Sequence, residues 1–341
     1  MGLKVAKKEN ILGLLERLAR DFLLIAPVRE DNLLFFRPVE AVGSIDLSPG
    51  KSVESPKGYF FPQTEVLYRY RTKDDKLMLA ETVDSRPAVL FGVHPCDLRS
   101  FAVLDAVFLE EPADKYYAMR REETILIGMS CNTVFPECFC TTYDISPVDG
   151  AGADIHLTDA GANYLVEILT PKGEELIAKY EMFFEENVAG TAEAKKGKEA
   201  ALLARFKLPV QVAGLPEKMP ALFDNSYWEK LSRRCLGCGV CTYVCPTCHC
   251  FDIMDEGIEC EGDRFRCWDS CIFREYTLHT SGHNPRHGLN QRLRNRFFHK
   301  LSYNYTRYNI EGCVGCGRCV ASCPVNIDIR EVIGTLRGLG G

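Results

Sequence analysis

Two cysteine runs with the same spacing lie in the last third of the chain. The first is Cys235, Cys238, Cys241 and Cys245 before Pro246, and the second is Cys313, Cys316, Cys319 and Cys323 before Pro324. Each reads C-x2-C-x2-C-x3-C-P, a spacing with which soft thiolate ligands hold cubane [4Fe-4S] clusters. The two runs therefore predict one-electron redox chemistry.

The pairing of the two runs predicts how the ligands are shared. In a two-cluster ferredoxin the fourth cysteine of each run binds the other cluster, so the ligand sets cross. We assign Cys235, Cys238, Cys241 and Cys323 to the first cluster, and Cys313, Cys316, Cys319 and Cys245 to the second.

Zinc is the alternative metal, because C-x2-C pairs also build tetrahedral zinc sites. Zinc sites use two separated pairs, which explains neither a third cysteine at the same spacing nor a fourth followed by proline. Glycines also occur where a side chain would crowd a cluster or prevent a tight turn: Gly237, Gly239, Gly312, Gly315 and Gly317. The pattern favours iron–sulfur clusters over zinc.

Four further cysteines, Cys96, Cys131, Cys138 and Cys140, lie in the first half of the chain. Cys96 and Cys131 follow two predicted strands, and Cys138 and Cys140 form a C-x-C pair. Four converging thiols would suit a third iron–sulfur cluster or, less readily, zinc. The other interpretations are ordinary buried thiols or a redox-active thiol pair.

Five more cysteines, Cys248, Cys250, Cys260, Cys267 and Cys271, lie between the two runs and receive no assigned role. The chain has no Cys-Cys dipeptide of the kind that noncubane heterodisulfide-reducing centres need. It also shows no P-loop and no G-x-G-x-x-G after a strand, so it lacks the signatures of nucleotide hydrolysis and Rossmann-type binding.

A basic segment, residues 276–310, contains no Asp or Glu but six basic residues: Arg286, Arg292, Arg294, Arg296, Lys300 and Arg307. The simplest interpretation is a solvated helix face. The alternatives are that it offsets the negative charge of thiolate-bound clusters or docks an acidic partner subunit. The net charge of −6 and the lack of an RNA-binding signature argue against nucleic acid as a partner.

The elements that must position these cysteines fall into two predicted domains. Residues 1–220 read as an α/β domain, with an opening helix at about residues 7–22 and buried strands at residues 87–93 and 124–131. Strands that end at a common sheet edge would bring their following loops together in one crevice. Residues 221–341 read as a helical ferredoxin-like domain enlarged by an insertion, residues 246–312.

The composition is that of a globular protein, and 341 residues allow about two domains. No apolar stretch is long enough to span a membrane, and the first residues lack a signal-peptide pattern. We therefore expect a cytoplasmic protein in a reducing compartment, where many thiolates can stay bound to metal.

The order of motifs resembles a known family. GVHPCDLRSFAVLDAVF, CFCT, CTYVCPTCHCFDI, RCWDSC, RFFHKLSYN and GCVGCGRCVASCPVNIDI together are similar to the iron–sulfur beta subunit of cytoplasmic [NiFe] sulfhydrogenases and to the A subunit of anaerobic sulfite reductases. The resemblance covers residues 87 to 332. It places the family's dicluster ligands on the eight cysteines assigned above, and its N-terminal elements on Cys96, Cys138 and Cys140.

The resemblance implies a subunit that relays electrons between a flavin subunit, linked to NAD(P), and a catalytic subunit of the hydrogenase, sulfite reductase or heterodisulfide reductase type. Two alternatives stay open. One is a reductase that acts on a sulfur compound by itself, with the N-terminal crevice as active site. The other is a metal-stabilised scaffold without redox function.

Overall fold

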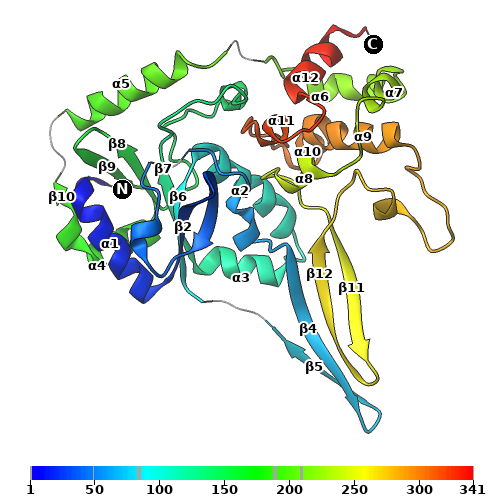
Figure 1. Ribbon diagram of the computed structural model, residues 1–341, viewed down its shortest axis with the longest axis horizontal. Helices are drawn as coiled ribbons and strands as arrows, with labels where there is room; N and C mark the ends of the chain where they lie inside the picture. Colours follow the sequence, from blue (N-terminus) through cyan, green and yellow to red (C-terminus); the bar gives the residue numbers. More distant parts are fainter. Residues whose placement is uncertain (1, 49, 83–85, 187–189, 208–209, 341) are drawn as a thin grey trace.

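The computed structural model describes residues 2–48, 50–82, 86–186, 190–207 and 210–340. Its first part is built on an eight-stranded mixed sheet in the order β10-β1-β9-β8-β7-β6-β2-β3 (Figure 1). The strands are β1 (Gly2–Lys7), β2 (Leu23–Glu30), β3 (Leu33–Pro38), β6 (Ala88–Val93), β7 (Thr124–Met129), β8 (Ile155–Asp159), β9 (Asn163–Ile168) and β10 (Glu185–Glu186). The central strands β2, β6, β7 and β8 are parallel, and antiparallel strands flank them.

Helices cover both faces of this sheet. Helices α1 (Lys8–Asp21) and α4 (Pro171–Lys179) pack on one face, while α2 (Pro95–Phe108) and α3 (Lys115–Glu123) pack on the other. Every residue of β6, with the sequence AVLFGV, is buried, as expected for a parallel strand covered on both faces. The predicted α/β character of the first part is confirmed.

The edge that carries the candidate residues is formed by β6 and β7. These two strands are parallel neighbours, so the loops that follow them leave the sheet at the same edge. His94 and Cys96 follow β6, and Cys131 follows β7. The two strands predicted at residues 87–93 and 124–131 are thus adjacent, as the sequence analysis expected.

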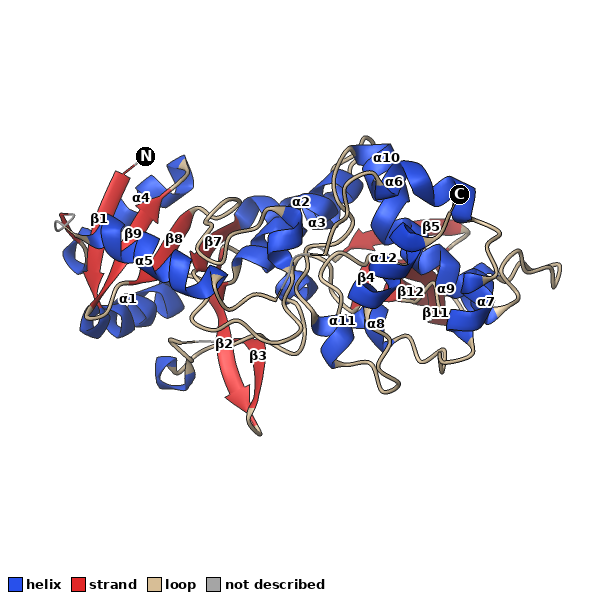
Figure 2. Cartoon of the chain, turned by 90° about the horizontal axis from the view of Figure 1, so that it is seen from above, coloured by secondary structure: helices blue, strands red, loops and turns tan. Residues whose placement is uncertain are grey.

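The second part contains short helices around the two cysteine runs, joined to the sheet part by α5 (Thr191–Leu203). Its helices are α6 (Leu215–Lys218), α7 (Tyr227–Ser232), α8 (Val240–Tyr243), α9 (Leu289–Phe298), α10 (Asn304–Tyr308), α11 (Arg318–Ala321) and α12 (Ile329–Gly338). A π-helical turn, His299–Tyr303, joins α9 to α10. Figure 2 shows the eight-stranded sheet at one end of the molecule and these helices at the other.

The insertion between the two runs also contributes a β-hairpin, made of β11 (Phe251–Ile258) and β12 (Glu261–Trp268). β12 pairs with β4 (Thr64–Lys73) from the first part, and β5 (Lys76–Glu81) completes a four-stranded sheet in the order β11-β12-β4-β5. The expectation that the second part is helical is therefore not confirmed. The two parts share a sheet across the predicted boundary.

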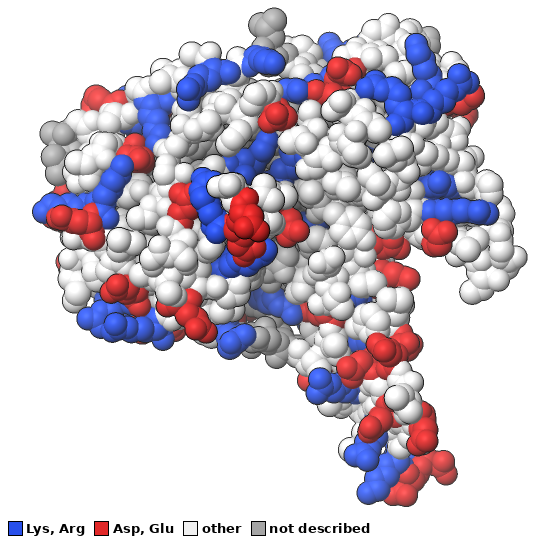
Figure 3. Space-filling view, viewed as in Figure 1, with Lys and Arg blue, Asp and Glu red and all other residues white. Residues whose placement is uncertain are grey.

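The four-stranded sheet projects from the body as an arm (Figure 1). At its base, buried Arg266 forms ion pairs with Glu65 and Asp114. At its tip, the β4–β5 turn carries Lys73, Asp74, Asp75 and Lys76, and Figure 3 shows charges of both signs along the arm. No helix among the described residues is long and apolar enough to cross a membrane.

A buried ion pair joins the two parts next to the cysteines. The Arg318 guanidinium donates to both carboxylate oxygens of Asp97, at 2.8 and 2.7 Å, and to the backbone oxygen of Ser52 at 2.9 Å. The side chains of Arg318 and Asp97 are 2% and 1% exposed. Asp97 follows β6, and Arg318 lies between Cys316 and Cys319, so this pair fixes the sheet edge against the second run.

We predict that Asp97→Asn destabilises the chain by about 3–5 kcal/mol, because it leaves a buried guanidinium without its counter-ion. Thermal unfolding of the anaerobically purified protein measures the loss. Asp224→Asn is the matched control, since Asp224 is 92% exposed in its pair with Arg294 and should cost little. Equal stability of the two variants would contradict the proposal that the Asp97–Arg318 ion pair holds the two parts together.

Candidate metal centre

A cavity next to the first run is lined by Cys235, Cys238, Cys241 and Cys323, together with Cys319. Apolar side chains of α9 and its surroundings form much of the remaining wall, including Ile272, Leu293 and Phe297. Cys323 belongs to the second run, so the fourth cysteine of one run reaches the cavity of the other.

A second cavity is lined by Cys245, Cys313, Cys316 and Cys319. Here the fourth cysteine of the first run, Cys245, joins three cysteines of the second. Cys319 borders both cavities. The structure thus gathers the eight sequence-predicted cysteines around two adjacent spaces, and the fourth cysteine of each run is exchanged.

Backbone N–H groups point at sulfur in both runs. Gly237 donates to Cys235 Sγ at 3.4 Å, Gly315 donates to Cys313 Sγ at 3.5 Å, and Ile327 donates to Cys323 Sγ at 3.2 Å. Gly237 and Gly315 have φ angles of 69° and 62°, a region that glycine adopts without strain. Loops of this kind fit thiolate-bound clusters, whose sulfur atoms accept such hydrogen bonds.

Burial makes these thiols poor acids without a metal. It raises the pKa of Cys313 to about 11, and that of Cys316 and Cys319 to about 12. Cys245 differs: the thiol of Cys248 donates to it and Lys300 lies nearby, so its pKa is well below the ordinary value. Because metal ligands must be deprotonated, filling the second cavity with iron would release protons.

Two residues of the basic segment lie beside the cavities. Arg296 borders both, and Lys300 borders the second; their exposed fractions are 4% and 2%. Arg292 donates to the backbone oxygen of Ile272 and lies near Cys235. Arg294 pairs with Asp224, and exposed Arg307 pairs with Glu110. The segment is therefore not a uniform solvated face, because two of its cations are buried against thiols.

The N-terminal cysteines lie next to the second run. Phe139, between Cys138 and Cys140, donates its backbone N–H to the oxygen of Gly315 at 2.8 Å and lines the second cavity. A Cβ atom on Gly315 would lie 2.5 Å from the Phe139 backbone, and one on Gly317 would lie 2.4 Å from the Glu137 oxygen. This close backbone contact requires glycine at both positions.

Electrostatic contacts among these thiols place them in one neighbourhood. Burial is the main cause that raises the pKa of Cys131 to about 12, followed by the nearby thiol of Cys138. The pKa of Cys140 is also raised, by burial and then by Cys131 and Cys138, and that of Cys96 is raised by burial and, among other groups, by Cys316. Across the described ranges, no group of three or more Cys, His, Asp or Glu residues is arranged to hold a single metal ion. A third metal centre therefore stays a prediction.

The five remaining cysteines fall into two sets. Cys248, Cys250 and Cys271 are buried or half-buried: the thiol of Cys248 is hydrogen-bonded to Cys245, and the thiols of Cys250 and Cys271 are hydrogen-bonded to each other. Cys260 is exposed in the hairpin turn, and Cys267 lies in β12. Cys267 and Cys271 are therefore not on one helical turn, although four-residue spacing is compatible with one.

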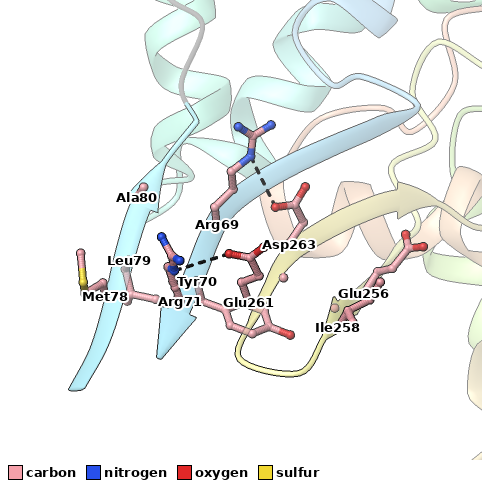
Figure 4. A pocket seen from close by; sticks show the side chains of 12 residues that line it. Arg69, Tyr70, Arg71, Met78, Leu79, Ala80, Glu256, Ile258, Glu261 and Asp263 are labelled. Atoms are coloured by element: carbon pink, nitrogen blue, oxygen red, sulfur yellow. Dashed lines mark ion pairs between the residues drawn. The ribbon is translucent and has the colours of Figure 1, made fainter. Parts of the chain in front are cut away.

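Several residues at the centre carry no sequence signal of their own. Lys57, 2% exposed, donates to the backbone oxygen of Cys248 at 2.8 Å. Asp97 and Arg318 lie in predicted motifs, but their pairing depends on the packing of the two parts. A surface hollow on the arm (Figure 4), with ion pairs Arg69–Asp263 and Arg71–Glu261, is lined by no cysteine and is separate from the centre.

Comparison with known proteins agrees with this geometry. Residues 234–327 match the family model of the 4Fe-4S dicluster domain, which covers both cysteine runs. Over 316 residues, the chain is 31% identical to sulfhydrogenase 2 subunit beta of Pyrococcus furiosus, and the match covers 91% of each chain. The match includes most of the sheet part as well as the dicluster domain, and the chain therefore belongs to the family of sulfhydrogenase beta subunits.

Proposed function

We propose that the chain is an electron-transfer subunit that holds two [4Fe-4S] clusters in the adjacent cavities. Cys235, Cys238, Cys241 and Cys323 bind the first cluster, and Cys313, Cys316, Cys319 and Cys245 bind the second. The observation that carries the proposal is that each cavity receives the fourth cysteine of the other run. When bound, the clusters supply one-electron chemistry, and the chain provides the ligands, the hydrogen bonds and the buried charge.

Electrons would pass through this subunit between two partners in a hetero-oligomer: a flavin subunit linked to NAD(P), and a catalytic subunit of the hydrogenase, sulfite reductase or heterodisulfide reductase type. The sulfhydrogenase beta subunit, at 31% identity, supports a hydrogenase-type complex. Such a subunit would work in the cytoplasm, where its partners take electrons from nicotinamide nucleotides.

The N-terminal thiols extend the path in this proposal. Cys96, Cys131, Cys138 and Cys140 would bind a third cluster, adjacent to the second cavity through Phe139 and Gly315. The three centres would then lie in the order first cluster, second cluster, N-terminal centre. This packing also favours a relay over a separate active site, because Arg318 and Gly315 of the second run contact Asp97 and Phe139, in the segments that follow β6 and β7.

The function is tested on the complex isolated anaerobically from its native host through a tag on this chain. We expect a flavin subunit and a catalytic subunit to copurify, and NADH or NADPH to bleach cluster absorption in the complex but not in the isolated chain. Reduction of sulfite or polysulfide by the isolated chain with reduced viologen would instead support the independent reductase.

The exchange of fourth cysteines makes a specific prediction. Cys245→Ser should remove or convert the second cluster, so its EPR spectrum should match that of Cys313→Ser and differ from that of Cys235→Ser. Cys260→Ser, a change at an exposed thiol in a turn, is the control and should keep both clusters. A Cys245→Ser spectrum matching that of Cys235→Ser would show that each run binds its own cluster.

The third centre is tested separately by Cys138→Ser. If the N-terminal thiols hold a cubane, the variant should lose about four irons per chain while both dicluster signals persist. Cys267→Ser, which changes a thiol in β12, should lose none. Unchanged iron content in Cys138→Ser would show that the N-terminal thiols are structural.

A further inference from the structure

Arg296 lies between the two cysteine-lined cavities. It comes from α9, near the start of the π-helical turn, and it borders both spaces. Its side chain is buried, with 4% exposure. Lys300, four residues later, borders the second cavity but not the first.

The guanidinium of Arg296 is incompletely bonded. Its Nη2 donates to the backbone oxygen of Cys241 at 3.3 Å, while its Nε has no hydrogen-bond partner among the described residues. Within the same residues it forms no ion pair with a carboxylate, unlike buried Arg266 and Arg318. Burial lowers the pKa of this guanidinium, whereas Cys241 and Cys319, in their thiolate forms, raise it well above the ordinary value.

A buried cation without a counter-ion is strongly destabilising, so a fold that keeps one must compensate its charge. Thiolate-bound clusters in the two cavities would lie on two sides of the Arg296 guanidinium, and their negative charge would compensate its positive charge. Lys300 is placed differently, since its Nζ donates to Thr247 Oγ1 at 2.6 Å beside the second cavity.

We infer that Arg296 tunes both clusters: its charge, buried beside both cavities, raises both reduction potentials together. Lys300 acts on the second cluster alone. The physical reason is that reduction adds one negative charge, which a nearby buried cation stabilises. This inference rests on the proposed binding of two clusters and adds a residue that raises the potentials of both.

EPR-monitored redox titration of the full chain, purified anaerobically, tests the inference. Arg296→Gln should lower both potentials, each by at least a tenfold change in the reduction equilibrium, which is about 59 mV for one electron. Lys300→Met should lower one potential only. Arg294→Gln is the matched control, because it removes the same charge from the same helix where Arg294 pairs with Asp224 outside the cavities.

Arg296→Lys separates the effect of the charge from that of the guanidinium shape. Because lysine keeps the charge, both potentials in Arg296→Lys should lie closer to the native values than to those of Arg296→Gln. A shift in only one cluster, or one no larger than in Arg294→Gln, would overturn the inference. If Arg296→Gln fails to assemble, pulsed EPR of the ¹⁵N-arginine-labelled chain decides: a ¹⁵N coupling lost at each cluster between the native chain and Arg296→Lys supports the inference, and couplings unchanged by Arg296→Lys overturn it. A native chain without two clusters would instead defeat the proposed function.

Discussion

The constraint on which the rest of the structure depends is the burial of negative charge. Two thiol-lined cavities lie side by side in an apolar surrounding, where each isolated thiolate would be costly. The chain meets this cost with buried cations from segments far apart in sequence: Arg296 and Lys300 within the insertion, and Lys57 between β3 and β4. Each cation also donates to a backbone or side-chain oxygen of the cysteine loops. The same groups therefore offset negative charge and hold the loops in place.

This constraint also explains why the two parts of the chain are closely joined. Asp97 follows β6 and neutralises Arg318 in the second run, while the backbone of residues 137–140 lies against Gly315 and Gly317. The hairpin β11–β12 then pairs with β4 and carries Arg266 to Glu65. The sheet part is therefore a wall of the second cavity, and it contributes Phe139 to that cavity's lining.

Local patterns in the sequence predicted the parts that depend on neighbouring residues. The C-x2-C-x2-C-x3-C-P spacing is a property of single loops, and it identified the eight cysteines that line the two cavities. The apolar sequence of β6 by itself predicted a buried strand, without knowledge of the strands beside it. The arm escaped prediction because β4, β5 and β11 are largely exposed and lack the alternation of a half-buried strand. Likewise, the place of Lys57 follows from tertiary packing. The sequence offered compensation of cluster charge as one alternative for the basic segment, but it could not single out Arg296 and Lys300, since surface and buried cations look alike in a sequence.

The central claim is that two clusters occupy adjacent cavities and can exchange electrons. The most direct measurement is the EPR spectrum of the fully reduced, anaerobically purified chain, with spins counted per chain. Two S = 1/2 centres in neighbouring cavities should interact, giving about two spins per chain from these cavities and a spectrum broadened by spin–spin coupling. A spectrum without spins, as for zinc, or with two magnetically isolated centres would contradict the account.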